Sequence, residues 1–248
     1  MSFHLLAYYT APGATASDLD LTPVTDNVVS IVNGHFFPQQ DTRLIFASAM
    51  TTNFDRIRIT QPSLRLITLP YIRPIIDSLV PASLDRVADY TSNPLRIRGL
   101  EELGLEATQS SGNADIGAVV AIQETYEAPP TGDIYTLRGT SGTSAVGDTW
   151  TTISITWNDQ LPDGVYAVVG FNGIGANCLA YRLIFEGQTW RPGCLGYPAD
   201  SDIPDKIFEW GRLGTWGRFR QTAMPQVQVL SNTTTGTHEV YLQIVKVG

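Results

Sequence analysis

Cysteine is nearly absent from this chain, and the shortage limits both its scaffold and its metal chemistry. Only Cys178 and Cys194 occur among 248 residues. Two cysteines cannot build a disulfide-rich scaffold or a four-cysteine zinc site. A single bridge between them stays open as an alternative, but two reduced thiols buried in a core are the favoured interpretation.

Long hydrophobic runs are missing as well. No stretch approaches the roughly 18 apolar residues that a membrane-spanning helix needs, so we expect no transmembrane segment. The opening residues, MSFHLLAYYT, lack the basic region, the apolar stretch and the cleavage site of a secretory signal. With 43% hydrophobic residues, the chain still holds enough apolar side chains for a globular core.

Lysine is scarce, since Lys206 and Lys246 stand beside fourteen arginines, and the formal net charge is −8. A protein that holds nucleic acid through its phosphates normally carries a basic arm or patch, and neither end of this chain has one. Direct nucleic-acid binding is therefore not expected. The arginine bias has two open explanations: a GC-rich genome, or a surface adapted to protein–protein contacts, where arginine is enriched over lysine.

Residue patterns for catalysis are also lacking. The three histidines, His4, His35 and His238, form no H-x-H or H-E-x-x-H pair, and the last two follow turns, where we expect surface positions. No nucleophile elbow, phosphate-binding loop or EF-hand spacing occurs. We interpret the acidic residues as solvated surface charge, because neighbours such as Glu101 and Glu102 point to opposite faces of a strand. The sequence therefore predicts no catalytic residue, cofactor or metal ligand.

Short alternating apolar runs bounded by Gly, Pro, Asn and Ser fill the chain and indicate β-strands. Residues 73–80 and 83–90 have helical spacing and predict a loop with a turn or two of helix. The segment ETYEAPPTGD interrupts the strands, with about eight of them on either side. We therefore predict an all-β fold of two tandem eight-stranded jelly rolls, residues 1–127 and 133–248, with a linker at 128–132.

An apparent internal repeat supports this division. An Asn-Gly pair at Asn33 is followed by Arg-Leu-Ile-Phe at Arg43, and the same pattern recurs 139 residues later at Asn172 and Arg182. A repeat at a fixed offset is typical of a duplicated unit. We expect Arg43 and Arg182 to occupy equivalent strands and to point outward, on faces covered by the other half of the chain or by a neighbouring subunit.

Two eight-stranded halves joined by a short proline-containing linker resemble the double jelly-roll major capsid proteins of the adenovirus-like lineage, which includes tailless icosahedral viruses of bacteria and archaea. The resemblance implies a structural protein and not an enzyme. It implies homotrimers whose six jelly rolls form a pseudo-hexagonal capsomer of an icosahedral shell. It also implies neighbouring capsomers and minor capsid or vertex proteins as partners, and a place in the virion after assembly in the host cytoplasm.

Tryptophans alternate with arginines among glycines in the last quarter of the chain. These residues are Trp190, Arg191, Trp210, Arg212, Trp216, Arg218 and Arg220. Three interpretations stay open: a core filled by the tryptophans, a subunit interface, or a platform on which sugar or single-stranded nucleic acid stacks. As candidate site residues we assign all seven to a subunit interface, because Trp and Arg dominate interface hot spots.

Two other function classes compete with the capsid interpretation. One is a tandem β-sandwich carbohydrate-binding protein, a lectin or a virion spike, in which the Trp190–Arg220 region contacts glycan. The other is a β-sandwich hydrolase with an unrecognised carboxylate pair, for which Glu124 is the residue to test.

Overall fold

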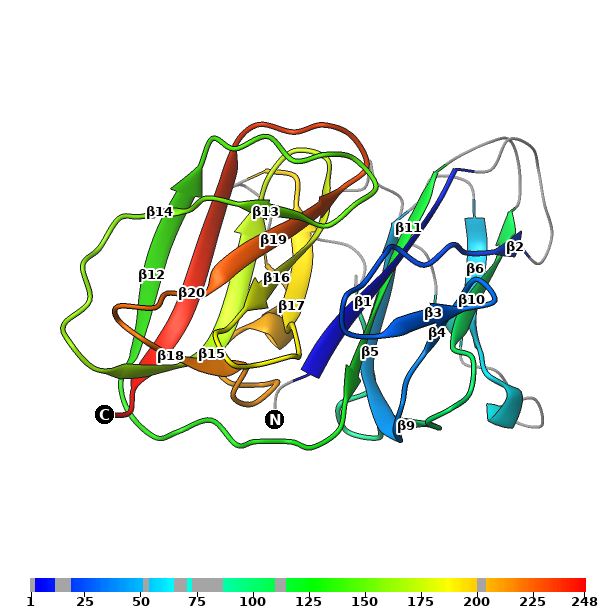
Figure 1. The fold of residues 1–248 in the computed structure, drawn as a ribbon, viewed down its shortest axis with the longest axis horizontal. Coiled ribbons are helices and arrows are strands. Elements are labelled where there is room, and N and C mark those ends of the chain that lie inside the picture. The colour runs from blue at the N-terminus through cyan, green and yellow to red at the C-terminus, as the bar shows by residue number, and fades with distance from the viewer. Residues whose placement is uncertain are drawn as a thin grey trace. The chain divides into compact units, whose positions relative to one another are not determined.

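The computed structural model describes residues 3–11, 19–50, 54–64, 71–72, 87–109, 115–199 and 204–248. Across these ranges the chain is all-β, and its helical elements are two short 3-10 turns, η1 (Pro62–Leu64) and η3 (Lys206–Phe208). The predicted helical turn at 73–80 lies outside the described residues, as does the first half of 83–90. In the second half the prediction was wrong, because Ala88–Asp89 form a short strand that pairs with Phe46 and Ala47. The chain divides into two compact units (Figure 1), one of Leu6–Ile122 and one of Met1–Leu5 with Gln123–Gly248.

The first unit contains two main sheets and a small hairpin. Its strands are β1 (Phe3–Thr10), β2 (Leu19–Asp20), β3 (Ser30–Val32), β4 (His35–Phe37), β5 (Thr42–Met50), β6 (Phe54–Thr60), β7 (Tyr71–Ile72), β8 (Ala88–Asp89), β9 (Leu95–Ile97), β10 (Gly104–Gln109) and β11 (Ile116–Gln123). One sheet has the order β1-β11-β5-β8, with β9 also pairing β5, and the other has the order β2-β10-β6-β7. β3 and β4 form the hairpin.

The second unit has the same organisation. Its strands are β12 (Ile134–Ser141), β13 (Thr151–Ile153), β14 (Thr156–Trp157), β15 (Val165–Ile174), β16 (Cys178–Ile184), β17 (Gly193–Tyr197), β18 (Gly217–Arg220), β19 (Gln226–Ser231) and β20 (His238–Lys246). The pairs β12-β20-β15-β18 make one layer, and β13-β19-β16-β17 make the other. A short parallel pairing of β15 with β17 joins the two layers at one edge.

The strand order of each unit is that of a jelly roll. In this fold the first, last, third and sixth strands form one sheet, and the second, seventh, fourth and fifth form the other. The first unit follows this order once the β3–β4 hairpin is treated as an insertion and β8 with β9 as one interrupted strand. The second unit follows it with β14 as the added strand. The predicted fold class, two tandem jelly rolls, is therefore confirmed.

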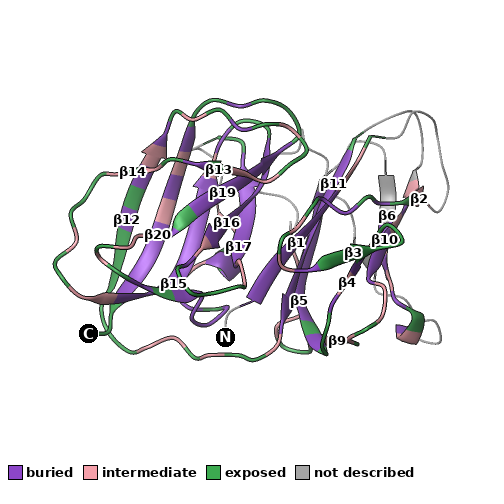
Figure 2. Cartoon of the chain, viewed as in Figure 1, coloured by how far each residue is buried: buried purple, intermediate pink, exposed green. Residues whose placement is uncertain are grey.

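The burial of the central strands matches their amino-acid pattern. All eight residues of β11, IGAVVAIQ, are buried, and β15 is buried over eight of its ten positions (Figure 2). Strands covered on both faces are encoded by continuous apolar runs, whereas strands with one wet face alternate. Strand β12 shows the second pattern from its middle onward: Leu137, Gly139 and Ser141 are buried, whereas Arg138 is exposed and Thr140 is half-buried.

The apparent repeat was wrong as a guide to equivalent positions. Arg43 lies in β5, the third strand of its jelly roll, whereas Arg182 lies in β16, the fourth strand of the other. Asn33 begins the tight turn of the β3–β4 hairpin with a φ of +51°, whereas Asn172 lies inside strand β15. Alternating strands share short motifs easily because the same few apolar residues satisfy every one of them.

The first residues of the chain pack with the second unit. The Leu5 amide donates to the Arg191 carbonyl over 3.0 Å, and the Arg191 amide donates to Nδ1 of His4, also over 3.0 Å. The Phe3 ring meets the edge of Trp216 with 4.9 Å between centroids. Strand β1 therefore contributes residues to both units, and the boundaries 1–127 and 133–248 stay a prediction.

Both cysteines are free and buried. Cys194 in β17 pairs with Tyr181 of β16, which is three residues along that strand from Cys178. Three residues of strand span about 10 Å. A disulfide needs Cα atoms within about 7 Å, so this register keeps the two thiols apart.

Candidate functional site

The seven predicted interface residues do not share one environment. Trp216 is fully buried, and its ring also lies 6.3 Å from that of Phe171 between centroids. It is a core residue of the second unit, which agrees with the core interpretation for this one tryptophan. Trp190 and Arg191 are half-buried, and Trp210, Arg212, Arg218 and Arg220 are exposed. The interface role of these six stays a prediction.

Two of the arginines have polar partners within their own unit. The Arg218 guanidinium donates to Glu127 over 2.7 Å, which ties β18 to the segment that precedes the second jelly roll. The Arg191 guanidinium donates to Oε1 of Gln228 over 3.2 Å. Both arginines therefore help to hold the second unit together, whatever else they contact.

Trp210 is the most exposed tryptophan of the predicted set, with 64% of its surface accessible. Its φ of +58° is in the left-handed region, where a bulky side chain is rarely found. The Trp210 amide donates to Oε1 of Gln243 over 2.7 Å, and the indole N–H donates to Oε2 of Glu209 over 3.0 Å. The backbone and the ring of Trp210 are thus both fixed by hydrogen bonds.

The loop that carries Trp210 is attached to strand β15 at a β-bulge. β15 shifts register against β20 around Val169, whose carbonyl accepts the Gly211 amide over 2.7 Å. A β-bulge leaves some backbone groups of a strand without partners in the sheet, and here the Val169 carbonyl bonds to the loop instead. Gly170 leaves room for the Gln243 side chain, because a Cβ at Gly170 would lie 2.4 Å from Oε1 of Gln243.

Arg182 of β16 is a buried arginine that was not among the predicted site residues. Arg182 is 1% exposed, and its Nε donates to Oε1 of Gln228 over 2.7 Å. The indole of Trp150 lies over its guanidinium. The outer face at Arg182 is therefore covered by a loop of the same unit, although we expected the other half of the chain or a neighbouring subunit to cover it.

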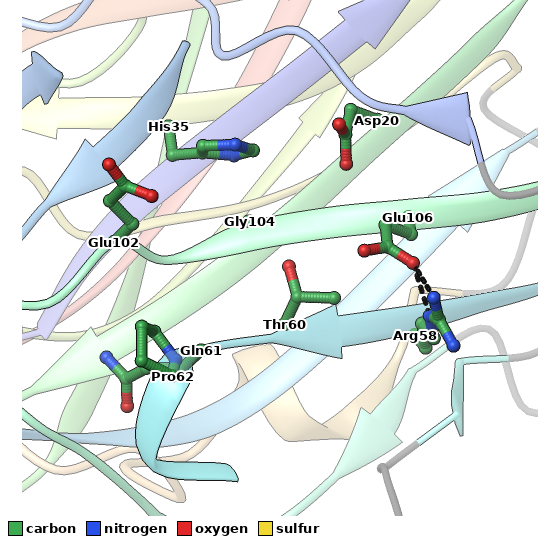
Figure 3. A pocket seen from close by; sticks show the side chains of 9 residues that line it. All are labelled: Asp20, His35, Arg58, Thr60, Gln61, Pro62, Glu102, Gly104 and Glu106. Carbon is green, nitrogen blue, oxygen red and sulfur yellow. Dashed lines mark hydrogen bonds and ion pairs between the residues drawn. The ribbon is translucent and has the colours of Figure 1, made fainter. Parts of the chain in front are cut away.

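A hollow of about 370 Å³ lies over the β2-β10-β6 sheet of the first unit (Figure 3). Its lining residues are Asp20, His35, Arg58, Thr60, Gln61, Pro62, Glu102, Gly104 and Glu106. Position 104 has no room for a side chain, because a Cβ there would lie 2.6 Å from Oγ1 of Thr60 and 2.7 Å from Nδ1 of His35. From the sequence we interpreted the carboxylates of this set only as solvated surface charge, since they come from segments far apart in the chain.

The charge of this hollow, which we call the acidic hollow, is negative. Three carboxylates line it against a single guanidinium. Glu106 stands opposite Asp20 on one neighbouring strand and opposite Arg58 on the other, and it forms an ion pair with Arg58 (Figure 3). Glu102 accepts a hydrogen bond from Nδ2 of Asn33 over 2.8 Å, and Asp20 is exposed. The arrangement suits a cationic group.

A second hollow, of about 270 Å³, lies in the second unit beside Trp190. Its polar lining comes from Glu127, Gln188, Thr189 and Arg218, and its apolar wall includes both Trp190 and Trp216. The His4 ring meets Trp190 edge to face at 5.9 Å between centroids. A half-buried indole among amide, hydroxyl and carboxylate groups is the composition that stacks against sugar rings.

His238 corrects a further expectation, because the structure buries it completely. Its Nδ1 lies 3.1 Å from the Tyr181 hydroxyl and 3.6 Å from Sγ of Cys178, and its Nε2 lies 3.1 Å from Oγ1 of Thr235. Burial lowers the pKa of His238 and raises the pKa of the Cys178 thiol to about 11. Both groups are therefore neutral near pH 7, and the cluster holds no thiolate nucleophile.

Two absences concern only the part of the chain that the structure describes. There, no group of three His, Cys, Asp or Glu side chains is placed to hold a metal ion. The same described ranges contain no helix with the length and apolar character to cross a membrane.

Comparisons with known proteins find similarity among solved structures but not in sequence. No protein-family model and no curated protein matches the chain. Among solved structures, the chain is similar to the major capsid protein P2 from bacteriophage PM2, with 9% sequence identity over 99% of this chain and 98% of that chain and a TM-score of 0.25. A TM-score of 0.25 is too low to equate the two folds, so the jelly-roll assignment depends on the strand pairing of this chain alone.

Proposed function

We propose that this chain is a structural major capsid protein, which trimerises into pseudo-hexagonal capsomers and tiles an icosahedral virion shell. The observation that carries the proposal is the presence of two complete jelly rolls, each with the full strand order, in one continuous polypeptide. Three such chains around an axis supply six similar units, and six similar units fill a hexagonal position in a closed lattice.

The surface chemistry supports a protein that binds copies of itself. Four of the predicted interface residues, Trp210, Arg212, Arg218 and Arg220, are exposed on the second unit, and the acidic hollow lies on the first. Arginine and tryptophan are enriched at the centres of protein interfaces. Minor capsid or vertex proteins would be further partners, and the virion, after assembly in the host cytoplasm, would be the location.

The size of the purified protein in solution tests the proposal. We expect sedimentation velocity to give the mass of three chains, and electron microscopy to show hexagonal tiles or closed particles at higher concentration. A protein that sediments as a single chain at every concentration, with no particles in the images, contradicts the proposal.

A carbohydrate-binding role is the second candidate, and the hollow beside Trp190 is the observation that favours it. In that case the protein should be retained on an immobilised glycan, and Trp190→Ala should abolish retention while circular dichroism shows that the variant is still folded. Retention that is unaffected by Trp190→Ala argues against this hollow as a sugar site.

A further inference from the structure

Two apolar residues share an unusual combination of backbone conformation and exposure. Five residues other than glycine have a positive φ in the described chain; three of them are Asn or Asp, and the other two are Leu100 and Trp210. The same two are the most exposed large hydrophobic residues of the described chain, at 66% and 64%. Each jelly roll therefore shows one large apolar side chain to solvent from a left-handed backbone position.

Neither feature helps the isolated chain. A left-handed conformation costs a non-glycine residue on the order of 1–3 kcal/mol, whereas glycine adopts it freely. An exposed indole also leaves apolar surface in water without the gain of burial. Folding alone would be served better by glycine at Trp210, so the tryptophan is best explained by a contact outside the chain.

The loop around Trp210 holds the ring ready for such a contact. The hydrogen bonds from the Trp210 amide to Gln243 and from its indole to Glu209 fix the residue at both ends. Asn172 donates to the other oxygen of Glu209 over 3.2 Å, so the carboxylate is itself held in place. An anchor that is ordered before binding loses little conformational entropy when it binds, and this favours affinity.

Charge indicates where this anchor fits. Between Asp205 and Arg220 the chain carries four basic side chains against two acidic ones, and one of the four, Arg218, is already paired with Glu127. The acidic hollow carries three carboxylates against one guanidinium. Copies of a chain with net charge −8 repel one another unless oppositely charged faces meet. The acidic hollow lies on the first unit and the Trp210 loop lies on the second, so one copy offers both halves of a head-to-tail contact.

We propose that Trp210 is the anchor of the contact between copies of this chain, and that it docks at the acidic hollow on the first jelly roll of a second copy. Leu100 is exposed and lies two residues in the sequence from Glu102, which lines the hollow. A contact of this kind is heterologous, and a heterologous contact closes into a ring when its rotation divides a full turn. The inference rests on the proposed self-assembly and names the surfaces that perform it.

The variant Trp210→Gly separates an interface role from a structural one because the two roles predict opposite changes. Glycine relieves the strained φ, so we expect the midpoint of urea unfolding of the unassembled chain to stay level or rise. Removal of the ring should weaken association at least tenfold by sedimentation. Association equal to that of the original protein overturns the proposal, as does a fall in unfolding midpoint that accounts for the lost association.

The hollow is tested by Asp20→Lys, with Asp159→Lys as the matched control. Both aspartates are exposed, and both variants change the net charge equally, but only Asp20 lines the hollow. We expect Asp20→Lys alone to weaken association, and equal effects of the two variants overturn the docking at the hollow. If the original protein never associates, the proposed function fails. If it associates and neither Trp210→Gly nor Asp20→Lys weakens the association, only this inference fails.

Discussion

The guanidinium carbon of Arg182 lies 4.0 Å from the centroid of the Trp150 ring, and Arg182 is buried beneath that ring. A guanidinium over an indole is a cation–π contact, and the contact strengthens when the pair is shielded from water. Strand β16 thus keeps an arginine on a face that would otherwise require an apolar residue. Trp150 and the Gln228 side chain make this possible.

The first prediction concerns this pair. Arg182→Ala should lower the free energy of unfolding by about 2–4 kcal/mol, because it removes a buried, hydrogen-bonded cation and leaves Gln228 without that partner. Urea denaturation followed by tryptophan fluorescence measures the change. Arg43→Ala is the control: Arg43 has the same local sequence but is exposed, and its change should stay within about 0.5 kcal/mol. Equal losses in the two variants contradict the structure.

The second prediction concerns acid. Burial lowers the pKa of His238, and the residues that face its ring, Cys178, Tyr181 and Thr235, are uncharged near pH 7. The unfolded histidine takes up a proton near its usual pKa of about 6.5, whereas the folded one does so only at lower pH. Stability is therefore fully present above about pH 6.5 and falls as the pH drops towards the folded pKa, by up to about 1.4 kcal/mol per pH unit.

Urea denaturation at pH 7.5 and pH 5.5 checks this expectation for the original protein and for His238→Gln. We expect the variant to be less stable at pH 7.5. The difference between its free energies of unfolding at the two pH values should be smaller than in the original protein, because glutamine does not titrate. A pH dependence that is the same in both proteins shows that His238 does not titrate differently on unfolding.

The third prediction separates the two tryptophans that the sequence could not distinguish. Trp216 is fully buried against Phe3 and Phe171, so Trp216→Ala should lower the free energy of unfolding by about 3–5 kcal/mol. Trp210→Ala removes an exposed ring and should change it by less than about 1 kcal/mol. Thermal unfolding of each variant at a concentration where chains are separate gives the comparison. Similar losses at both positions would falsify the assignment of Trp216 alone to the core.

The fourth prediction concerns the thiols. The pKa of Cys178, raised by burial to about 11, and the burial of Cys194 make both sulfurs unreactive in the folded protein. A thiol reagent such as DTNB should therefore label two thiols per chain in urea and essentially none before unfolding. A reducing agent should leave the melting temperature unchanged. A melting temperature that drops on reduction points instead to a disulfide.

How far the sequence leads is clearest at Asn33 and Asn172. Each asparagine is followed by glycine and, after eight intervening residues, by Arg-Leu-Ile-Phe. Strand content, turns and the two-part division follow from short patterns of this kind. The equivalence inferred from them was wrong, because one asparagine begins a hairpin turn and the other lies inside a strand. A tetrapeptide specifies alternation along a strand but not which strand of the jelly roll it becomes.

The candidate site shows the same limit. The tryptophans and arginines of the Trp190–Arg220 region stand out by composition, but nothing local distinguishes Trp210 from Trp216. Asp20 and Glu106 are 86 residues apart and stand opposite each other only because β2 pairs with β10. His238 follows a polar loop that reads as surface, yet it is enclosed by residues from β16 and from that loop.

The sequence by itself determined the all-β class, the two series of strands and the lack of a recognisable catalytic motif, because alternation and turn chemistry act over a few neighbouring residues. Only the tertiary structure decided the strand order, the buried partners of Arg182 and His238, the acidic hollow and the display of Trp210. Each of these depends on contacts between segments far apart in the chain. The free energy of such contacts comes from burial and pairing, which no short window of sequence contains.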